Sequence, residues 1–204
     1  MMPKGATLER IAGPAGALEA IVIEAQVPLR GVAVVCHPNP TQGGSNTNKV
    51  VQTIAKALSR QGYVCYCPNL RGVGASEGEH DYGRGEVDDV RAVAAHAADR
   101  HGALPLLLAG FSFGGFVAAR ARESLGCERV LLVGVAVGKY ELPTPAVPED
   151  SVVIHGEDDE VIPLAAVMDW ARPQNLPVLV FPATGHFFHG KLLRLGLVIA
   201  RAFK

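Results

Sequence analysis

The stretch LPLLLAGFSFGGFVAARAR, residues 104–122, decides the fold of this chain. Its apolar beginning, residues 104–109, is typical of a buried strand, and residues 113–125 have the alanine-rich composition of a helix. Between them, Gly110 and Gly114 flank Ser112, which predicts a turn too tight for larger residues on either side of the serine. Glycines can also serve only to let a helix pack closely on a strand, so this pattern needs support from the rest of the chain.

The composition indicates one core and little net charge. The chain has 204 residues, a usual length for one domain, and 49% of them are hydrophobic. Nineteen basic residues against twenty acidic ones give a net charge of -1, so nothing favours nucleic acid or an anionic membrane as a partner. We therefore expect a single domain over residues 1–204, and a homo-oligomer is compatible with this sequence.

The N-terminus and the cysteines predict a cytoplasmic protein. Charged residues interrupt residues 1–27, so this segment lacks the apolar core of a secretory signal. The longest apolar stretch, residues 103–119, is broken by Pro105 and Ser112, and a strand, turn and helix explain it better than a membrane span. The four cysteines lack the Cys-x-x-Cys spacing of metal sites, so we expect reduced thiols, no metal and no cofactor.

Apolar runs alternate with helical patterns along the chain. The expected strands cover residues 18–25, 31–36, 63–67, 104–109, 129–136, 151–155 and 178–181. The expected helices cover residues 48–61, 86–100, 113–125, 163–172 and 189–203. Strands that alternate with helices are joined by right-handed crossovers into a parallel sheet. We therefore expect an α/β fold with a mostly parallel central sheet and helices on both faces.

A serine hydroxyl is a weak nucleophile at neutral pH, so Ser112 would need a base and an acid that orients the base. Both are expected on loops that follow strands, because open parallel sheets carry their sites at that edge. The acidic residues 157–160 follow the predicted strand at 151–155, and His186 follows the one at 178–181. The order serine, acid, histidine is one of the known orders in serine enzymes.

Several motifs give the chain a resemblance to a known family. They are HPNPTQGG at 37–44, NKVV at 48–51, RGVGASEG at 71–78, GFSFGG at 110–115, GEDDEVIP at 156–163, and Gly185 with His186. In this order they resemble the α/β-hydrolases, and within them the small lidless bacterial hydrolases described as predicted esterases. The resemblance spans most of the sequence and implies the α/β-hydrolase fold. Only residues 137–150 stand where relatives often insert a lid, so no substantial lid is expected.

The resemblance implies roles for three residues. Ser112 would be the nucleophile, His186 the general base and Asp159 its partner, acting through an acyl-enzyme intermediate. Asp158 is the alternative acid, but the family's Gly-x-x-Asp-x-x-x-Pro pattern selects Asp159. His189 is the alternative base, but Gly185 directly before His186 matches the family's pattern and favours His186.

The developing oxyanion would need two N–H donors. The amide of Phe113, directly after the nucleophile, is expected to be the first. The second should come from the loop after the strand at 31–36, where Pro38 and Pro40 have no N–H to give. This leaves Asn39 or Thr41, and the family's loop favours Asn39, although this chain carries proline and asparagine where relatives have glycines.

The implied activity is hydrolysis of carboxylic esters with small to medium acyl chains, the substrate being a small-molecule ester or thioester. Four phenylalanines flank the expected site and could either wall the acyl group or pack in the core: Phe111, Phe113, Phe187 and Phe188. A thioesterase or small peptidase of the same fold is an alternative, as is a binding protein without catalysis. A cysteine-dependent lactone hydrolase is disfavoured, because a serine occupies the turn.

Other polar residues are assigned to structure. Arg71 is expected to tie loops together, with substrate binding as the alternative. The acids at 86, 88 and 89 are expected to form a solvated first helical turn rather than a metal site. Four further histidines are expected to have no catalytic role, with the first packed inside and the others on the surface: His155, His80, His96 and His101.

Overall fold

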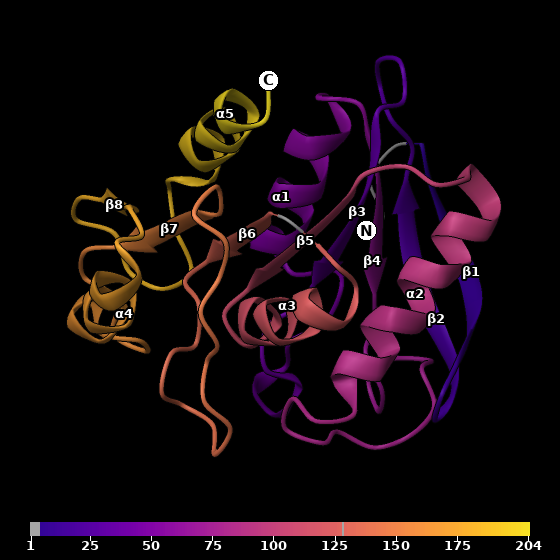
Figure 1. The fold of residues 1–204 in the computed structure, drawn as a ribbon, viewed down its shortest axis with the longest axis horizontal. Helices are drawn as coiled ribbons and strands as arrows, with labels where there is room; N and C mark the ends of the chain where they lie inside the picture. Colours follow the sequence, from indigo (N-terminus) through magenta and orange to yellow (C-terminus); the bar gives the residue numbers. More distant parts are fainter. Residues whose placement is uncertain (1–4, 128) are drawn as a thin grey trace.

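A computed structural model describes residues 5–127 and 129–204 (Figure 1). Residue 128 and residues 1–4, which begin the segment examined above for an export signal, lie outside the described part. The elements are β1 (Ala6–Gly13), β2 (Gly16–Ile23), β3 (Gly31–Cys36), η1 (Pro40–Gln42), α1 (Lys49–Ser59), β4 (Tyr63–Pro68), α2 (Glu86–His101), β5 (Leu106–Phe111), α3 (Phe113–Ser124), β6 (Val130–Val133), β7 (Val152–Gly156), α4 (Leu164–Ala171), η2 (Arg172–Gln174), β8 (Val178–Phe181) and α5 (Leu192–Ala202).

One eight-stranded sheet runs through the molecule in the order β1-β2-β4-β3-β5-β6-β7-β8. The six strands β4, β3, β5, β6, β7 and β8 pair in parallel with their neighbours. At the other end of the sheet, β1 pairs with β2 and β2 pairs with β4 in antiparallel fashion. β1 was not predicted, because this edge strand mixes charged residues with apolar ones and buries only Ile11 fully. An antiparallel edge strand can face water, so it needs no continuous apolar run.

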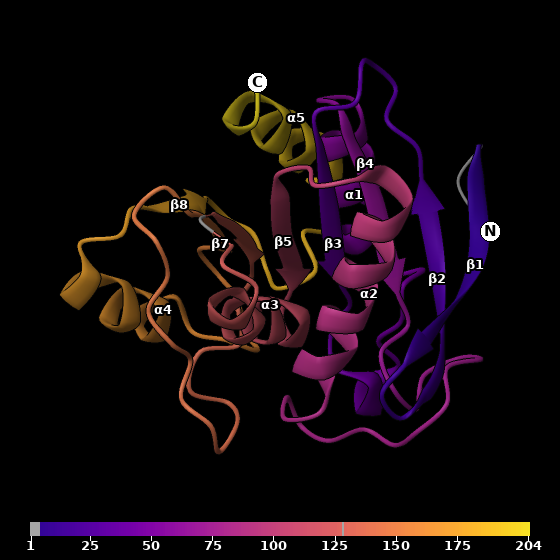
Figure 2. The ribbon, with the colours of Figure 1, turned by 45° about the vertical axis from the view of Figure 1, so that its right-hand side comes forward.

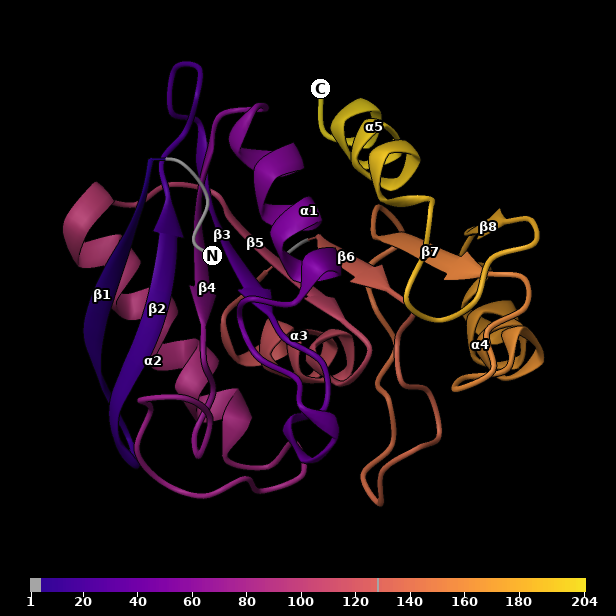
Figure 3. The ribbon, with the colours of Figure 1, turned by 180° about the vertical axis from the view of Figure 1, so that it is seen from behind.

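Helices cover both faces of the sheet, as predicted. Alternate residues of β3 point to opposite sides: Val32 and Val34 pack with α2 and α3, whereas Ala33 and Val35 pack with α1 and α5. Figure 1 shows α2 and α3 in front of the sheet, and Figure 3 shows α1 and α5 on the other face. The result is a three-layer arrangement with a core on each side of the sheet.

The strand before Ser112 lies two residues later than expected. It begins at Leu106 and ends at Phe111, directly before the serine. Pro105 has no N–H, and only its carbonyl joins the ladder by accepting from Val32 N–H at 2.9 Å. The shift makes the turn at Ser112 a single residue between strand and helix.

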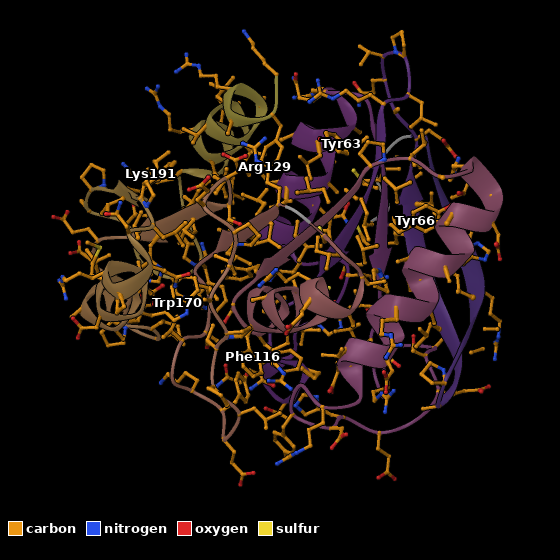
Figure 4. The ribbon with its side chains drawn as sticks, in the orientation of Figure 1. Tyr63, Tyr66, Phe116, Arg129, Trp170 and Lys191 are labelled. Atoms are coloured by element: carbon orange, nitrogen blue, oxygen red, sulfur yellow. The ribbon has the colours of Figure 1, made fainter. Side chains whose placement is uncertain are left out.

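The loops that follow β3, β4 and β6 gather at one edge of the sheet, at the bottom of Figure 2. Between β6 and β7, residues 134–151 form a long loop without a helix, consistent with the expected lack of a lid. This loop is tied to α4 by Trp170, labelled in Figure 4, whose Nε1–H donates to the Pro145 carbonyl at 3.1 Å. Among the described residues, no helix is both long enough and apolar enough to cross a bilayer.

The approach of α3 to β3 leads to a stability prediction. A Cβ on Gly114 would lie 2.2 Å from the Cys36 carbonyl oxygen, so Gly114→Ala must displace backbone. We expect a loss of at least about 3 kcal/mol in the free energy of unfolding, measured by urea denaturation. Gly196→Ala in α5 is the control: its Cβ would meet only the Thr53 methyl at 3.5 Å, and we expect a gain of about 0.5–1 kcal/mol. Similar stabilities for the two variants would contradict the account.

Candidate active site

Ser112 lies on a strained turn between β5 and α3. Its φ of 54° and ψ of -116° place it in a region that residues other than glycine rarely adopt, at a typical cost of about 1–3 kcal/mol. Backbone bonds hold it there, since Ser112 N–H donates to Val133 at 2.9 Å and Ala136 N–H donates to the Ser112 carbonyl at 3.2 Å. A Cβ on Gly110 would lie 2.2 Å from the Gly114 carbonyl carbon, so only glycine fits there. The turn therefore has the geometry of a nucleophile elbow.

The structure brings Ser112, His186 and Asp159 together. His186 Nδ1 lies 2.7 Å from Asp159 Oδ2, and His186 Nε2 lies 3.0 Å from Ser112 Oγ. A carboxylate only accepts, so Nδ1 carries the proton and Nε2 is free to accept from the serine hydroxyl. All three residues are buried. The histidine is thus positioned to take the serine proton.

Asp159 is held in its ionised form. Burial by itself would raise the pKa of this carboxyl, but donation from His186 and from the Ile162 amide outweighs it and lowers the pKa. Its Oδ1 accepts from Val161 N–H at 2.9 Å and from Ile162 N–H at 2.7 Å. These bonds leave Oδ2 directed at His186.

The two rival residues lie apart from this arrangement. Asp158 is exposed, and its backbone N–H donates to Thr184 at 3.0 Å. His189 is also exposed, and its ring contacts Phe187 at a centroid distance of 5.8 Å. The neighbouring Glu160 supports the loop, because its Oε2 accepts from His186 N–H at 3.2 Å.

A second histidine, His155, contacts Asp159. This contact was not predicted from the sequence. His155 is completely buried, as expected, and its Nε2 lies 2.9 Å from the Ile162 carbonyl and 3.3 Å from Asp159 Oδ2. Both neighbours are acceptors, so Nε2 carries the proton and the ring is neutral. Burial lowers the pKa of His155, which keeps it uncharged. The His155 imidazole therefore helps to hold the same Asp159 oxygen, Oδ2, that bonds to His186.

The loop after β3 is fixed by His37. Its Nε2 accepts from Leu70 N–H at 3.1 Å, so Nδ1 carries the proton and donates to the Pro38 carbonyl at 2.7 Å. Burial lowers the pKa of His37 to about 4, and the ring is neutral at physiological pH. This tie positions the following residue, Asn39, at the cavity beside Ser112.

The two candidates for the second oxyanion donor differ in their bonding. Thr41 N–H donates to Asn39 Oδ1 at 3.0 Å, and the Thr41 hydroxyl donates to the same oxygen at 2.9 Å. The N–H of Asn39 meets no acceptor within residues 5–127 and 129–204. Phe113 is the first residue of α3, and the first N–H groups of a helix have no acceptor within the helix, so the Phe113 amide is free to donate to an oxyanion. These facts favour Asn39 over Thr41.

The cavity at Ser112 is small, and the four phenylalanines are not part of its wall. It has a volume of about 120 Å³ and is lined by Asn39, Gln42, Ser112, Ala136, Lys139, Tyr140, Val161 and Ile162. Three of the four phenylalanines are completely buried in the core: Phe111, Phe113 and Phe188. Only Phe187 is exposed, at 42%, and none of the four lines the cavity, so core packing is the interpretation that holds for the three buried ones. Apolar runs beside a site fill the core first, because that is where they bury most area.

Buried charges stabilise the loop after β4. The Arg71 guanidinium binds the Asp89 carboxylate at 2.8–3.1 Å, and the Asp89 hydrogen bond raises the pKa of Arg71. Arg71 therefore has a structural role, as predicted, but it ties the loop after β4 to helix α2 and not to another loop. The expectation of a solvated first turn was wrong for Asp89 and Glu86, both completely buried, whereas Asp88 is exposed. Within the described residues no cluster of metal-ligating side chains is found.

His80 was expected on the surface, but it lies against the buried Glu86. The Glu86 oxygens accept from Asp81 N–H at 2.7 Å and Gly83 N–H at 2.8 Å, and Oε1 lies 2.7 Å from His80 Nδ1. The His80 side chain is therefore mostly covered rather than on the surface. His96 is partly exposed and pairs with Glu9, and His101 bonds to the Tyr66 hydroxyl at 2.9 Å.

The contact between His155 and Asp159 can be tested by stability. His155→Phe keeps a ring but removes the donor to the Ile162 carbonyl and to Asp159. We expect the free energy of unfolding to fall by about 1–3 kcal/mol, measured by urea denaturation. His189→Phe, at an exposed position, should change it by less than about 0.5 kcal/mol. Equal losses in the two variants would show that the bonds of His155 contribute nothing specific.

Comparisons with known proteins show which proteins the chain is similar to. The model of the Hydrolase_4 family, described as serine aminopeptidase, S33, matches residues 28–148, more than half of the chain. An uncharacterized protein of Rickettsia prowazekii is 32% identical over 163 residues, covering 77% of this chain and 68% of that protein. The crystal structure of a lidless α/β serine hydrolase from Xanthomonas campestris is 35% identical, with a TM-score of 0.92, and the match covers 99% of this chain and 95% of that one. An α/β serine hydrolase homologue from Coxiella burnetii is 33% identical, with a TM-score of 0.87 and 98% of each chain covered. These likenesses confirm the predicted fold, and the chain belongs to the α/β-hydrolase family of serine hydrolases.

Proposed function

We propose that this chain hydrolyses carboxylic esters of short acyl chains through an acyl-enzyme intermediate on Ser112. The observation that carries the proposal is the chain of contacts from Asp159 to His186 at 2.7 Å and from His186 to Ser112 at 3.0 Å. Such a chain serves to remove a serine proton during attack. The ordered geometry also argues against a binding protein without catalysis, because the arrangement needs a strained serine that binding alone does not require.

The steps follow from the positions of the side chains. Ser112 Oγ attacks the carbonyl carbon while His186 Nε2 takes its proton, and the ionised Asp159 stabilises the resulting imidazolium. The tetrahedral oxyanion accepts from the amides of Phe113 and Asn39. His186 then donates its proton to the departing alcohol. In the second half of the reaction, His186 activates water, which releases the acid from Ser112.

The shape of the site supports water as the acceptor and a short acyl group. Residues 134–151, where a lid would stand, form a loop without a helix, so we expect water to reach the acyl-enzyme and hydrolysis to be favoured over transfer. A cavity of about 120 Å³ suits a small acyl group better than a long one. Within the expected range of small to medium acyl chains, we therefore favour the short end.

An aminopeptidase is the second candidate, because the matching family model carries that description. Recognition of a peptide's free amino terminus calls for an acidic side chain near the nucleophile. The described residues around the Ser112 cavity include Lys139 and no acid. This charge disfavours an ammonium group, so the ester remains our proposal.

Acyl-chain length and the role of Ser112 can be tested together. With p-nitrophenyl acetate, butyrate and octanoate, we expect kcat/KM to fall beyond butyrate because the cavity is small. Ser112→Ala should lower the rate on acetate by a factor of at least about 10³. Equal rates for the variant and the wild type would overturn the proposed function. Faster cleavage of octanoate than of acetate would overturn only the acyl-size argument.

The second oxyanion donor can be tested through the backbone. Asn39→Pro removes the N–H, and the native φ of -53° suits a proline. We expect kcat to fall by about 10² to 10³, as for loss of an oxyanion donor in other serine enzymes. Asn39→Ala keeps the amide and serves as the matched variant, with a much smaller expected loss. Similar losses in both variants would assign the effect to the side chain instead of the amide.

A further inference from the structure

A second, larger hollow adjoins the cavity at Ser112. It has a volume of about 380 Å³ and is lined by Tyr82, Arg84, Lys139, Tyr140, Glu141 and Leu142. Lys139 and Tyr140 also line the cavity of about 120 Å³ at the serine, so the two spaces share a wall. A substrate that is bound at Ser112 and reaches past Lys139 would meet the hollow.

The segment that carries Lys139 is anchored on its C-terminal side. The ring of Tyr140 stacks on Phe116 at a centroid distance of 5.0 Å and meets Phe113 edge-on at 5.1 Å. Phe116 belongs to α3, the helix that starts at the nucleophile turn, and is labelled in Figure 4. Glu141 pairs with Arg84 at 2.6 Å across the hollow. These contacts hold the backbone of Lys139 beside the site.

The charge of Lys139 is uncompensated there. Glu141 pairs with Arg84 and not with Lys139, and within residues 5–127 and 129–204 no carboxylate lies within 4.0 Å of the Lys139 ammonium. Lys139 is the only residue with a charged side chain among the described residues that line the cavity at Ser112. Tyr82, which is 54% exposed, adds an aromatic side chain to the lining of the hollow. A positive group and an aromatic surface in one hollow suit an anionic ligand with an apolar body.

Given the proposed esterase function, we propose that the hollow binds the alcohol part of the ester and that Lys139 selects an alcohol carrying a carboxylate. The short acyl group occupies the small cavity, and the larger anionic part occupies the hollow. In the reaction, the bond from Ser112 Oγ to the acyl carbon forms and the bond from that carbon to the alcohol oxygen breaks. The alcohol oxygen receives the proton from His186, and water later releases the short acid.

A matched pair of acetyl esters tests the role of Lys139. The pair is 4-acetoxybenzoate, which carries a carboxylate on its phenol, and the neutral 4-acetoxybenzamide. The measured quantity is the ratio of their kcat/KM values, compared between variants so that intrinsic reactivity cancels. We expect Lys139→Met to lower this ratio about 3- to 5-fold, as for a partly exposed ion pair. Lys139→Glu should lower it further, and added salt should lower the wild-type ratio.

Lys56→Met on α1 is the control for loss of a surface lysine, and it should keep the wild-type ratio. A ratio unchanged by both Lys139 substitutions, while the esters are still cleaved through Ser112, would overturn this inference and leave the proposed function standing. No cleavage of either ester above the Ser112→Ala level would overturn both.

Discussion

The close contact between the first turn of α3 and the end of β3 is the constraint on which the rest of the site depends. Gly114 has no side chain, so its backbone can lie against the carbonyls of Cys36 and His37. This contact brings the start of α3, with the amide of Phe113, next to the loop that carries Asn39. Two amides from distant parts of the chain thereby lie beside one serine. A larger residue at position 114 would separate them.

The site is rigid because its supports are buried and satisfied by hydrogen bonds. His37 and His155 are neutral imidazoles, and each links two segments: one holds the loop before Asn39, and the other holds Asp159. Arg71 and Asp89 fix the loop that borders the larger hollow. A strained backbone at Ser112 persists only in such surroundings, where neighbouring bonds over-determine it. The chemistry therefore rests on residues that need never touch the substrate.

Much of this architecture was predictable from the sequence, for physical reasons. Six of the seven predicted strands, β3 to β8, pair in parallel, and such strands are rich in apolar residues. Ser112, Asp159 and His186 stand on loops that such a sheet brings to one edge. β1 was not predicted, because an edge strand tolerates charged residues and so lacks a clear apolar run. The burial of Glu86 and Asp89 escaped because their partners, His80 and Arg71, lie on a loop without periodicity. For the same reason nothing in the sequence placed Lys139 at the cavity, and apolar patterns could not separate core phenylalanines from a cavity wall.

The central claim is that the strained turn makes Ser112 the one serine able to form a covalent intermediate. A fluorophosphonate probe, followed by intact mass and peptide mapping, tests this most directly. The account predicts a single adduct on Ser112 in the folded wild type and none in Ser112→Ala. An adduct on another serine, or none on the folded protein, would contradict it.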